Sequence, residues 1–430
     1  MDIAIISEHA SPLGAIGGTD AGGQNVYVAQ IAKNLASLGH RVEVFTRKES
    51  IDDPIYIDLE EGYRVVNVPA GPQIKIPKEE ILPLMEEFYR YLKDYIEVRD
   101  RKFDIVHANF WMSGLLAMRI KDDFNIPFAV TFHALGRVRR IHQGDRDHFP
   151  NERFHIEDLV IKKADAIIAE CPQDHEDLVS LYNANSKNIH TVPCGFDPDE
   201  FSMMDKDEAK HFLGIDPRVS VVLHLGRMVP RKGADNVIRG YSAYKKVSKK
   251  RTKLLIVGGE SDTPDPSITP ELGRLLKIVQ DEGLDQDVVF TGRRSREMLK
   301  LYYNASDVFV TTPWYEPFGI TPLEAMACGV PVIGSDVGGI KFSVVHEKTG
   351  LLVPPNDPLS LKNAFVRILE DDKYRQILSI NSVERVNNQF RWEHVSAQLE
   401  NLFISLVGHK VENTMFNIKL NQEVLNEISR

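Results

Sequence analysis

Two segments in the second half of the chain combine charged side chains and glycine in spacings that could bind a phosphorylated ligand. In Gly226–Gly233 (GRMVPRKG), Arg227 and Lys232 lie five residues apart, directly after an apolar run. Two cations placed there could hold both phosphates of a diphosphate and stabilise the negative charge that develops on a leaving group. The same spacing also occurs in solvated basic loops, where exposed charges contribute little.

The second segment, Glu316–Gly329 (EPFGITPLEAMACG), carries two glutamates eight residues apart. Thr321 is expected to cap a helix whose first position is Pro322, so that the free N–H groups of the first turn could hold a phosphate. Glu316 and Glu324 could then accept hydrogen bonds from vicinal sugar hydroxyls. Two structural alternatives remain: Glu324 has the spacing of a capping box with Thr321, and Glu316 could be a solvated loop carboxylate.

The first half of the chain offers a glycine-rich turn and a histidine at the ends of apolar runs. Residues 17–25 (GGTDAGGQN) precede a long helical pattern, where exposed glycine N–H groups and the helix N-terminus favour an anion. The spacing is not GxGxxG, and no GxxxxGK[ST] occurs, which disfavours dinucleotide and P-loop sites; a flexible turn remains the alternative. His133 ends a predicted strand, at the edge where a doubly wound sheet binds ligands, although a lone histidine is more often structural.

The elements that must position these residues follow from short apolar runs that alternate with amphipathic helical stretches, a pattern typical of parallel sheets buried on both faces. The first set of predicted strands is Ile3–Ser7, Arg41–Thr46, Tyr63–Val68, Ile105–Ala108, Phe128–Phe132, Ala166–Ala169 and Ile189–Val192. The second set is Val219–Leu225, Leu254–Val257, Val288–Phe290, Val308–Thr311, Val332–Gly334 and Leu351–Val353.

Two doubly wound α/β domains facing each other across a cleft are therefore predicted. The boundaries are residues 1–195 for an acceptor-binding domain and 196–391 for a nucleotide-sugar-binding domain. The stretch Pro193–Pro217 is the expected linker, and a helical tail, about 392–430, is expected to pack back towards the first domain.

Composition limits the class of protein. The 430 residues carry a formal net charge of −10, which argues against a nucleic-acid-binding surface over the whole chain. The three cysteines have no CxxC spacing, no apolar run is long enough to span a membrane, and the first apolar run lacks a basic leader. We therefore expect a cytoplasmic protein. No HExxH, GxSxG or paired Cys/His set supports a hydrolase or a metalloenzyme.

Together these segments resemble the retaining glycosyltransferases of family 4, which have the GT-B fold of two Rossmann-like domains facing across a cleft. The resemblance extends from the glycine-rich loop to the segment FRWEHVSAQLENLF at residues 390–403. It implies that the two cations of the first segment replace a metal ion, so that no cofactor and no metal is needed. The catalytic residues that it implies are His133, Arg227, Lys232 and Glu316.

The resemblance also implies how a donor would be bound. Glu316 and Glu324 would bind the donor sugar and the ribose, His133 would contact the sugar, and the backbone around Arg293 would meet the base. The full set of implied nucleotide-sugar-binding residues is Gly22, Gly23, Arg227, Lys232, Arg293, Glu316, Phe318, Gly319, Ile320, Thr321 and Glu324.

Two branches of the family compete for the acceptor, and both use a phosphorylated one. Residues 22–24 (GGQ) and 133–137 (HALGR) are similar to sucrose-phosphate synthases, which glucosylate fructose 6-phosphate. Residues 11–13 (SPL) and 25–27 (NVY) are similar to the inositol-phosphate N-acetylglucosaminyltransferases of mycothiol synthesis. A Tyr and a Thr that help to hold inositol phosphate are replaced here by Phe110 and Ala134, which weakens the inositol assignment. The implied acceptor-binding residues are Gln24, Lys78 and Arg153, of which the last two are expected to open helices.

Glucose transfer from UDP-glucose to a sugar phosphate such as fructose 6-phosphate is therefore the leading hypothesis. UDP-N-acetylglucosamine transfer to an inositol phosphate is the alternative within the class. A noncatalytic nucleotide-sugar-binding protein is a further alternative, although Arg227, Lys232 and Glu316 are all present. A phosphorylase would need a pyridoxal-phosphate lysine, which no motif identifies.

Chelation tests the expectation that no metal is required. Activity should be largely retained in EDTA, because Arg227 and Lys232 would neutralise the phosphates without a metal ion. Initial rates of transfer with and without EDTA measure this. Complete loss of activity, restored by Mg²⁺ or Mn²⁺, would contradict it.

Overall fold

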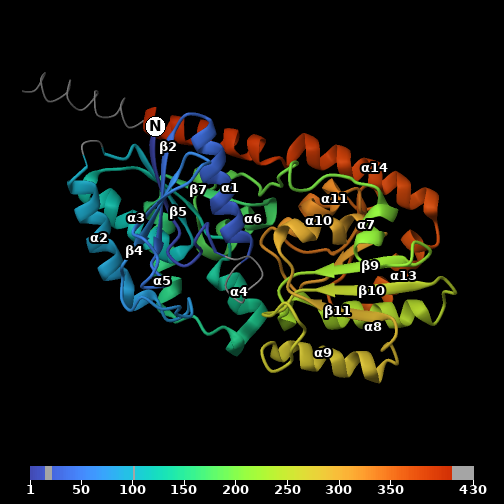
Figure 1. Ribbon diagram of the computed structural model, residues 1–430. Helices are drawn as coiled ribbons and strands as arrows, with labels where there is room; N and C mark the ends of the chain where they lie inside the picture. Colours follow the sequence, from blue (N-terminus) through green and yellow to red (C-terminus); the bar gives the residue numbers. More distant parts are fainter. Residues whose placement is uncertain (15–21, 100–101, 409–430) are drawn as a thin grey trace, which may run out of the picture.

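The computed structural model describes residues 1–14, 22–99 and 102–408 and contains two sheets, each made by one part of the chain (Figure 1). The expected α/β architecture with two Rossmann-like halves is confirmed. Most strands consist almost entirely of buried residues, because helices cover both faces of each sheet.

The first sheet has eight strands in the order β3-β4-β2-β1-β5-β6-β7-β8. Every pair of neighbours is parallel except β3 and β4. The chain first builds outwards on one side of β1 and then, from β5, on the other side, which makes the ends of β1 and β5 the topological switch point. The strands are β1 (Asp2–Ile6), β2 (Arg41–Arg47), β3 (Tyr56–Asp58), β4 (Arg64–Val68), β5 (Ile105–Asn109), β6 (Phe128–Thr131), β7 (Ala166–Ala169) and β8 (Ile189–Thr191).

The second sheet has six parallel strands in the order β11-β10-β9-β12-β13-β14, with its switch point between β9 and β12. The basic segment Gly226–Gly233 follows β9, and Glu316 follows β12, so both charged segments lie at this switch point. The strands are β9 (Ser220–Leu225), β10 (Thr252–Val257), β11 (Val288–Gly292), β12 (Val308–Thr311), β13 (Val332–Ser335) and β14 (Gly350–Val353).

The helices lie between the strands. In the first half they are α1 (Gly23–Ser37), η1 (Leu82–Leu84), α2 (Met85–Glu97), α3 (Trp111–Phe124), α4 (Gly136–Gln143), η2 (Gly144–Arg146), α5 (Glu152–Lys163), α6 (Pro172–Tyr182) and η3 (Ser186–Asn188). In the second half they are α7 (Lys206–Phe212), η4 (Pro230–Lys232), α8 (Ala234–Lys245), α9 (Pro270–Asp281), α10 (Arg296–Asn304), α11 (Ile320–Ala327), α12 (Ile340–Ser343), α13 (Pro358–Leu369) and α14 (Asp372–Gln389).

All thirteen strands expected from the apolar runs are present, with ends shifted by a few residues at most. The sequence analysis missed β3, because it is a short edge strand of exposed and half-buried residues, without a continuous apolar run. The expected opening of a helix by Lys78 is wrong: Lys78 lies in a turn, and regular helix begins at Met85 after η1. The expected linker also contains a helix, α7, capped by Asp205.

A last helix at residues 392–408 follows α14 and crosses from the second sheet to the first along the top of Figure 1. Its start is fixed by backbone hydrogen bonds between Phe196 and both Phe390 and Trp392, at 2.8 and 3.2 Å. The buried Trp392 ring then meets Tyr27 of α1 edge to face at 5.8 Å. The two halves thus share one apolar cluster, and the tail predicted beyond residue 408 lies outside the described residues.

None of the helices in the described part of the chain is long and apolar enough to cross a membrane.

Candidate active site

A cleft of about 270 Å³ lies between the switch points of the two sheets. Among the described residues that line it, nine are Lys or Arg and only three are Glu, although the whole chain is acidic. Such a local excess of positive charge favours anionic ligands. The nine cations are Lys78, Arg139, Arg153, Arg227, Arg231, Lys232, Arg293, Arg294 and Arg296.

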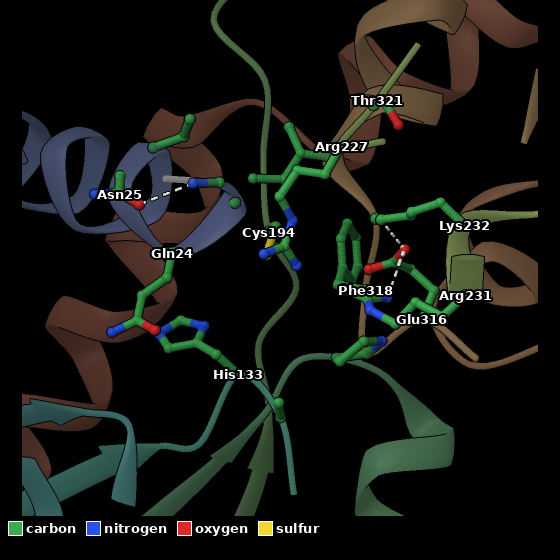
Figure 2. A pocket seen from close by; sticks show the side chains of 18 of the residues that line it. Gln24, Asn25, His133, Cys194, Arg227, Arg231, Lys232, Glu316, Phe318 and Thr321 are labelled. Carbon is green, nitrogen blue, oxygen red and sulfur yellow. Dashed lines mark hydrogen bonds and ion pairs between the residues drawn. The ribbon is translucent and has the colours of Figure 1, made fainter. Parts of the chain in front are cut away.

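Lys232 and Glu316 form an ion pair across the switch point of the second sheet (Figure 2). Lys232 is presented by η4, and the chain then turns through Gly233 in the left-handed conformation, with a φ of +71°. Glycine is required there because a Cβ atom would collide with the carbonyl oxygen of Thr312. The tight turn therefore places the ammonium group against the loop that carries the glutamate.

Burial and neighbouring charge shift the pKa values of this pair. Desolvation lowers the pKa of Lys232 to about 8, with further lowering from Arg231 and Arg227 and an opposing effect of Glu316. Burial alone would raise the pKa of Glu316, but the three nearby cations outweigh it and leave the pKa below its usual value. Glu316 is therefore an ionised acceptor for hydroxyl groups at neutral pH, and Lys232 is a cation that is close to its titration point.

Two further arginines surround the pair. The Nη1 atom of Arg231 lies 4.0 Å from Glu316 Oε2 and, within the described chain, has no hydrogen-bond partner. Arg227 faces the first sheet: a Cβ atom on Gly22, which precedes α1, would lie 3.8 Å from its Nε. The N-terminus of α1 is thus placed directly opposite the cations of the second sheet, as Figure 2 shows.

The loop after β12 differs in detail from the sequence prediction. Gly319, with a φ of +89°, takes the N-cap position and α11 begins at Ile320, so the expected cap at Thr321 and first position at Pro322 are wrong. The loop is pressed against Gly338 and Gly339, where Cβ atoms would collide with the backbone of Glu316 and Phe318. The left-handed glycine ends the loop two residues earlier than the capping pattern suggested, and the first N–H groups of α11 line the cleft.

Glu324 does not close a capping box. Its side chain is buried and accepts hydrogen bonds from Arg296 Nη1 at 2.8 Å and from Tyr303 Oη at 2.9 Å. Arg296 also pairs with Glu200. The expected ribose ligand is therefore held by two side chains of α10 and still lines the cleft, as do Arg293, Phe318, Gly319, Ile320 and Thr321.

His133 lies two residues after the end of β6 and faces this site from the first sheet (Figure 2). Its backbone is left-handed, with a φ of +57°, and its Nδ1 and Nε2 atoms each lie 3.0 Å from an acceptor, Glu170 Oε1 and Asn109 Oδ1. The Asn109 amide nitrogen donates to the carbonyl oxygen of His107 at 3.3 Å, which fixes its oxygen towards the imidazole. These contacts fix the orientation of the ring, and the nearby Gln24 side chain donates to the Asn109 carbonyl oxygen at 3.3 Å.

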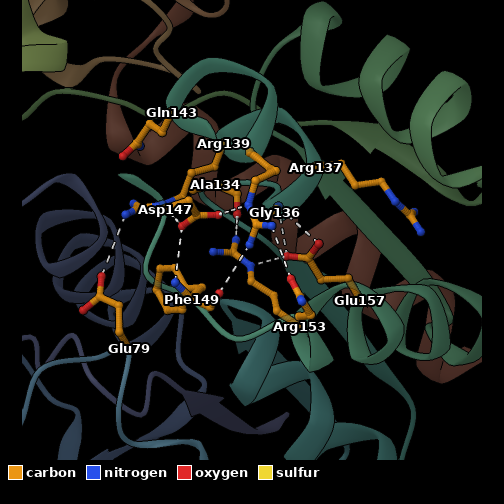
Figure 3. Close-up of polar contacts among 12 residues, drawn as sticks. Glu79, Ala134, Gly136, Arg137, Arg139, Gln143, Asp147, Phe149, Arg153 and Glu157 are labelled. Atoms are coloured by element: carbon orange, nitrogen blue, oxygen red, sulfur yellow. Dashed lines mark hydrogen bonds and ion pairs between the residues drawn. The ribbon is translucent and has the colours of Figure 1, made fainter. Parts of the chain in front are cut away.

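Arg153 lies on the first-sheet side of the cleft and is 1% exposed. Its Nε donates to Glu157 at 2.7 Å (Figure 3). Its guanidinium lies over the Phe149 and Phe110 rings at 4.6 and 5.0 Å. The Nη1 atom has no hydrogen-bond partner in the described residues. Arg153 is therefore a buried, paired cation and not part of a surface ion pair.

The cleft also contains residues that the sequence analysis did not identify. Arg139 of α4 lines it and donates to Asp147 at 2.7 Å. Arg231 and Arg296 face the donor side, and Glu170 holds His133. The local sequence does not separate Arg139, Arg296 and Glu170 from ordinary surface charges, because each has a partner that is distant in sequence. Arg231 did carry a signal, since it lies beside Lys232 in the basic segment.

Comparison with known proteins agrees with this geometry. Residues 21–200 match the family model described as Glycosyltransferase Family 4, and residues 205–385 match that of Glycosyl transferases group 1. The chain is 30% identical over 408 residues to D-inositol 3-phosphate glycosyltransferase of Corynebacterium diphtheriae and 32% identical over 417 residues to that of Corynebacterium aurimucosum. These alignments cover 94% and 96% of this chain and 94% and 97% of the relatives.

Among solved structures, the sucrose-phosphate synthase of Thermosynechococcus elongatus is similar with a TM-score of 0.87 and 33% identity, over 95% of this chain and all of the other. An Anabaena protein in complex with UDP-glucose shares the fold at a TM-score of 0.72 and 18% identity, over 94% of this chain and all of that one. The chain thus belongs to the family-4 glycosyltransferases of GT-B fold, and the resemblance inferred from its motifs is confirmed.

The buried pairing of Glu324 with Arg296 and Tyr303 and the capping box with Thr321 predict different effects of substitution on stability. Glu324→Gln should lower the stability of the second half, by about 1–3 kcal/mol, because Arg296 and Tyr303 lose a buried ionised acceptor. Thr321→Ala is the matched control and should change stability by less than about 0.5 kcal/mol, because Thr321 caps nothing. Urea unfolding of both variants measures this. A capping box would be supported instead if Thr321→Ala were the more damaging change.

Proposed function

We propose that this chain transfers glucose from UDP-glucose to a small phosphorylated sugar, with fructose 6-phosphate as the first acceptor to test. The donor would lie against the second sheet and the acceptor phosphate against the first. The two substrates would meet at His133, which projects between the two charged sides of the cleft.

The observation that carries the acceptor proposal is the buried guanidinium of Arg153. A buried charge is stabilised only when it is paired and hydrogen-bonded, and here Glu157 accepts from Nε while the carbonyl oxygen of Ala134 accepts from Nη2. The remaining Nη1 is buried in the wall of the cleft without a partner among the described residues. A phosphate oxygen would supply the missing acceptor in a charge-assisted hydrogen bond.

The distribution of charge supports two anionic substrates instead of one. Lys232, Arg227 and Arg231 lie around Glu316 at one switch point. Lys78, Arg139 and Arg153 belong to the other side of the same cleft, on the first half of the chain. One diphosphate would use the first group of cations, which leaves the second group for a phosphate on the acceptor.

The retaining reaction that the family resemblance implies would use this placement. An acceptor hydroxyl would attack the anomeric carbon while the bond from that carbon to the diphosphate breaks. The departing phosphate oxygen would take the hydroxyl proton, so that attack occurs on the face that the leaving group vacates and configuration is retained. Lys232, Arg227 and Arg231 would stabilise the charge that develops on the leaving group. Glu316 would accept hydrogen bonds from sugar hydroxyls, since its ion pair keeps it ionised.

Transfer to an inositol phosphate is the second candidate, because the relatives from Corynebacterium bear that activity in their names. The side chains near Arg153 favour a different acceptor. Phe110 places its ring, not a hydroxyl group, beneath the guanidinium, and Ala134 offers only its backbone oxygen. Two hydroxyl donors that would help to hold inositol phosphate are therefore missing.

Arg153→Lys tests the acceptor site without leaving Glu157 unpaired. Lysine keeps the positive charge but loses the planar fork, so the KM for fructose 6-phosphate should rise roughly tenfold, equivalent to about 1.4 kcal/mol. The KM for fructose and the affinity for UDP should be unchanged, because neither uses the unpaired Nη1. Steady-state kinetics with both acceptors measure the difference. An equal preference for the phosphorylated acceptor in wild type and variant would contradict the proposal.

The lowered pKa of Lys232 predicts how donor affinity depends on pH. Diphosphate binding favours the charged ammonium group of Lys232. The affinity for UDP should therefore be highest below the Lys232 pKa of about 8 and should weaken at higher pH. Well above this value the loss should approach about tenfold per pH unit. Lys232→Arg is the matched control, because a guanidinium remains charged and should remove this dependence. UDP titrations between pH 7 and 9 measure it; the same slope in both proteins would assign the effect to another group.

A further inference from the structure

Tyr315 joins the two halves of the cleft next to the donor site. It lies between β12 and α11, immediately before Glu316, and is 7% exposed. The ring of His142, the penultimate residue of α4, stacks on it with a centroid distance of 4.8 Å and an interplanar angle of 16°. Gln143, the last residue of α4, donates a hydrogen bond to its hydroxyl. A helix of the first half therefore ends on a loop of the second.

The same tyrosine supports the donor-side cations. The guanidinium of Arg231 lies over its ring at 5.3 Å, and the carbonyl oxygen of Arg231 accepts a hydrogen bond from the backbone N–H of Trp314 at 2.9 Å. Arg231 Nη1 faces Glu316 at 4.0 Å and has no hydrogen-bond partner in the described chain. The Tyr315 ring therefore packs against the guanidinium that faces Glu316.

The other end of α4 reaches the acceptor side. The backbone N–H of Gly136, its first residue, donates to both carboxylate oxygens of Glu157 at 3.1 Å, and Glu157 is the partner of Arg153 (Figure 3). Gly136 is needed there because a Cβ atom would lie 2.8 Å from both Arg153 Nε and Glu157 Oε2. α4 is eight residues long, about 12 Å at 1.5 Å per residue. One short rigid element thus connects the Arg153–Glu157 pair to Tyr315.

We propose that Tyr315 is a positioning residue that couples the two substrate sites: clamped by His142 and Gln143, it holds Arg231 beside Glu316, so that an acceptor phosphate at Arg153 and a nucleotide diphosphate at Lys232 strengthen each other's binding. The acceptor part of this statement rests on the proposed function. The coupling is a free energy shared by two sites, so it is reciprocal. Each ligand favours the arrangement in which α4 is docked on Tyr315, and each gains affinity when the other has already favoured it.

Calorimetric titration of UDP with and without saturating fructose 6-phosphate tests this coupling through the clamp, by which we mean the contacts of Tyr315 with His142 and Gln143. In the wild type the sugar phosphate should lower the Kd for UDP at least about fivefold. The coupling factor is the ratio of the Kd for UDP without fructose 6-phosphate to the Kd with it. In Tyr315→Ala this coupling factor should fall to about one or two, while the Kd for UDP alone changes only about threefold or less. Tyr315→Phe keeps the ring and loses the contact with Gln143, so it should give an intermediate factor. His142→Ala alters an exposed side chain and should reduce the factor without impairing folding.

The matched control removes a different contact between the halves. Lys341 donates to Gln173 of α6 at 2.8 Å and not to a residue of α4, so Lys341→Ala should retain the full coupling factor. Equal factors in wild type and Tyr315→Ala overturn the clamp and leave the proposed function standing. Failure of fructose 6-phosphate to bind the wild type overturns the proposed acceptor instead. Small-angle scattering with UDP alone then tests whether Tyr315 holds the two halves together. A larger radius of gyration in Tyr315→Ala than in the wild type supports the clamp, and equal radii overturn it.

Discussion

Pairing of positive charges inside the cleft is the constraint on which the rest of the site depends. Lys232 and Arg153 are each paired with one glutamate, Glu316 and Glu157, and Arg296 is paired with both Glu324 and Glu200. The side chains of Glu316, Glu157 and Glu324 are buried or nearly buried. Without these partners, desolvation would neutralise or expel the cations. With them, each cation keeps a fixed position and retains capacity for a further acceptor. The partners hold the cations in place, while the surplus of positive charge in the cleft is left for ligands.

Close backbone approach makes this pairing geometrically possible. Gly233, Gly338 and Gly136 lie at points where a Cβ atom would collide with the opposite loop or with the ion pair itself. The first two also adopt left-handed backbone conformations, which other residues reach only with strain. These glycines bring the loops after β9 and β13 against the loop after β12, and the start of α4 against the ion pair of α5. Electrostatics and backbone geometry are therefore inseparable in this cleft.

The chain also sets how the two sheets face each other. The helix at residues 392–408 returns from the second half to the first and buries Trp392 against Tyr27, while Tyr315 joins the halves at the cleft itself. One contact lies in the apolar cluster that the two halves share, and the other lies beside the donor site. A joint of this kind allows the cleft contacts to respond to ligands while the apolar contact holds the halves together.

The sequence by itself determined the architecture and the chemical character of the site. Apolar runs buried on both faces predict parallel strands whatever their neighbours, and only the exposed edge strand β3 escaped this pattern. Arg227, Lys232, Glu316 and His133 were identifiable because parallel sheets bind ligands at strand ends. Tertiary structure alone decided the partners. Glu324 has the spacing of a cap, yet it pairs with Arg296, because left-handed Gly319 moved the start of the helix. Arg139 and Tyr315 belong to the site through contacts with Glu79 and His142, which are far away in the chain, and local sequence does not predict such contacts.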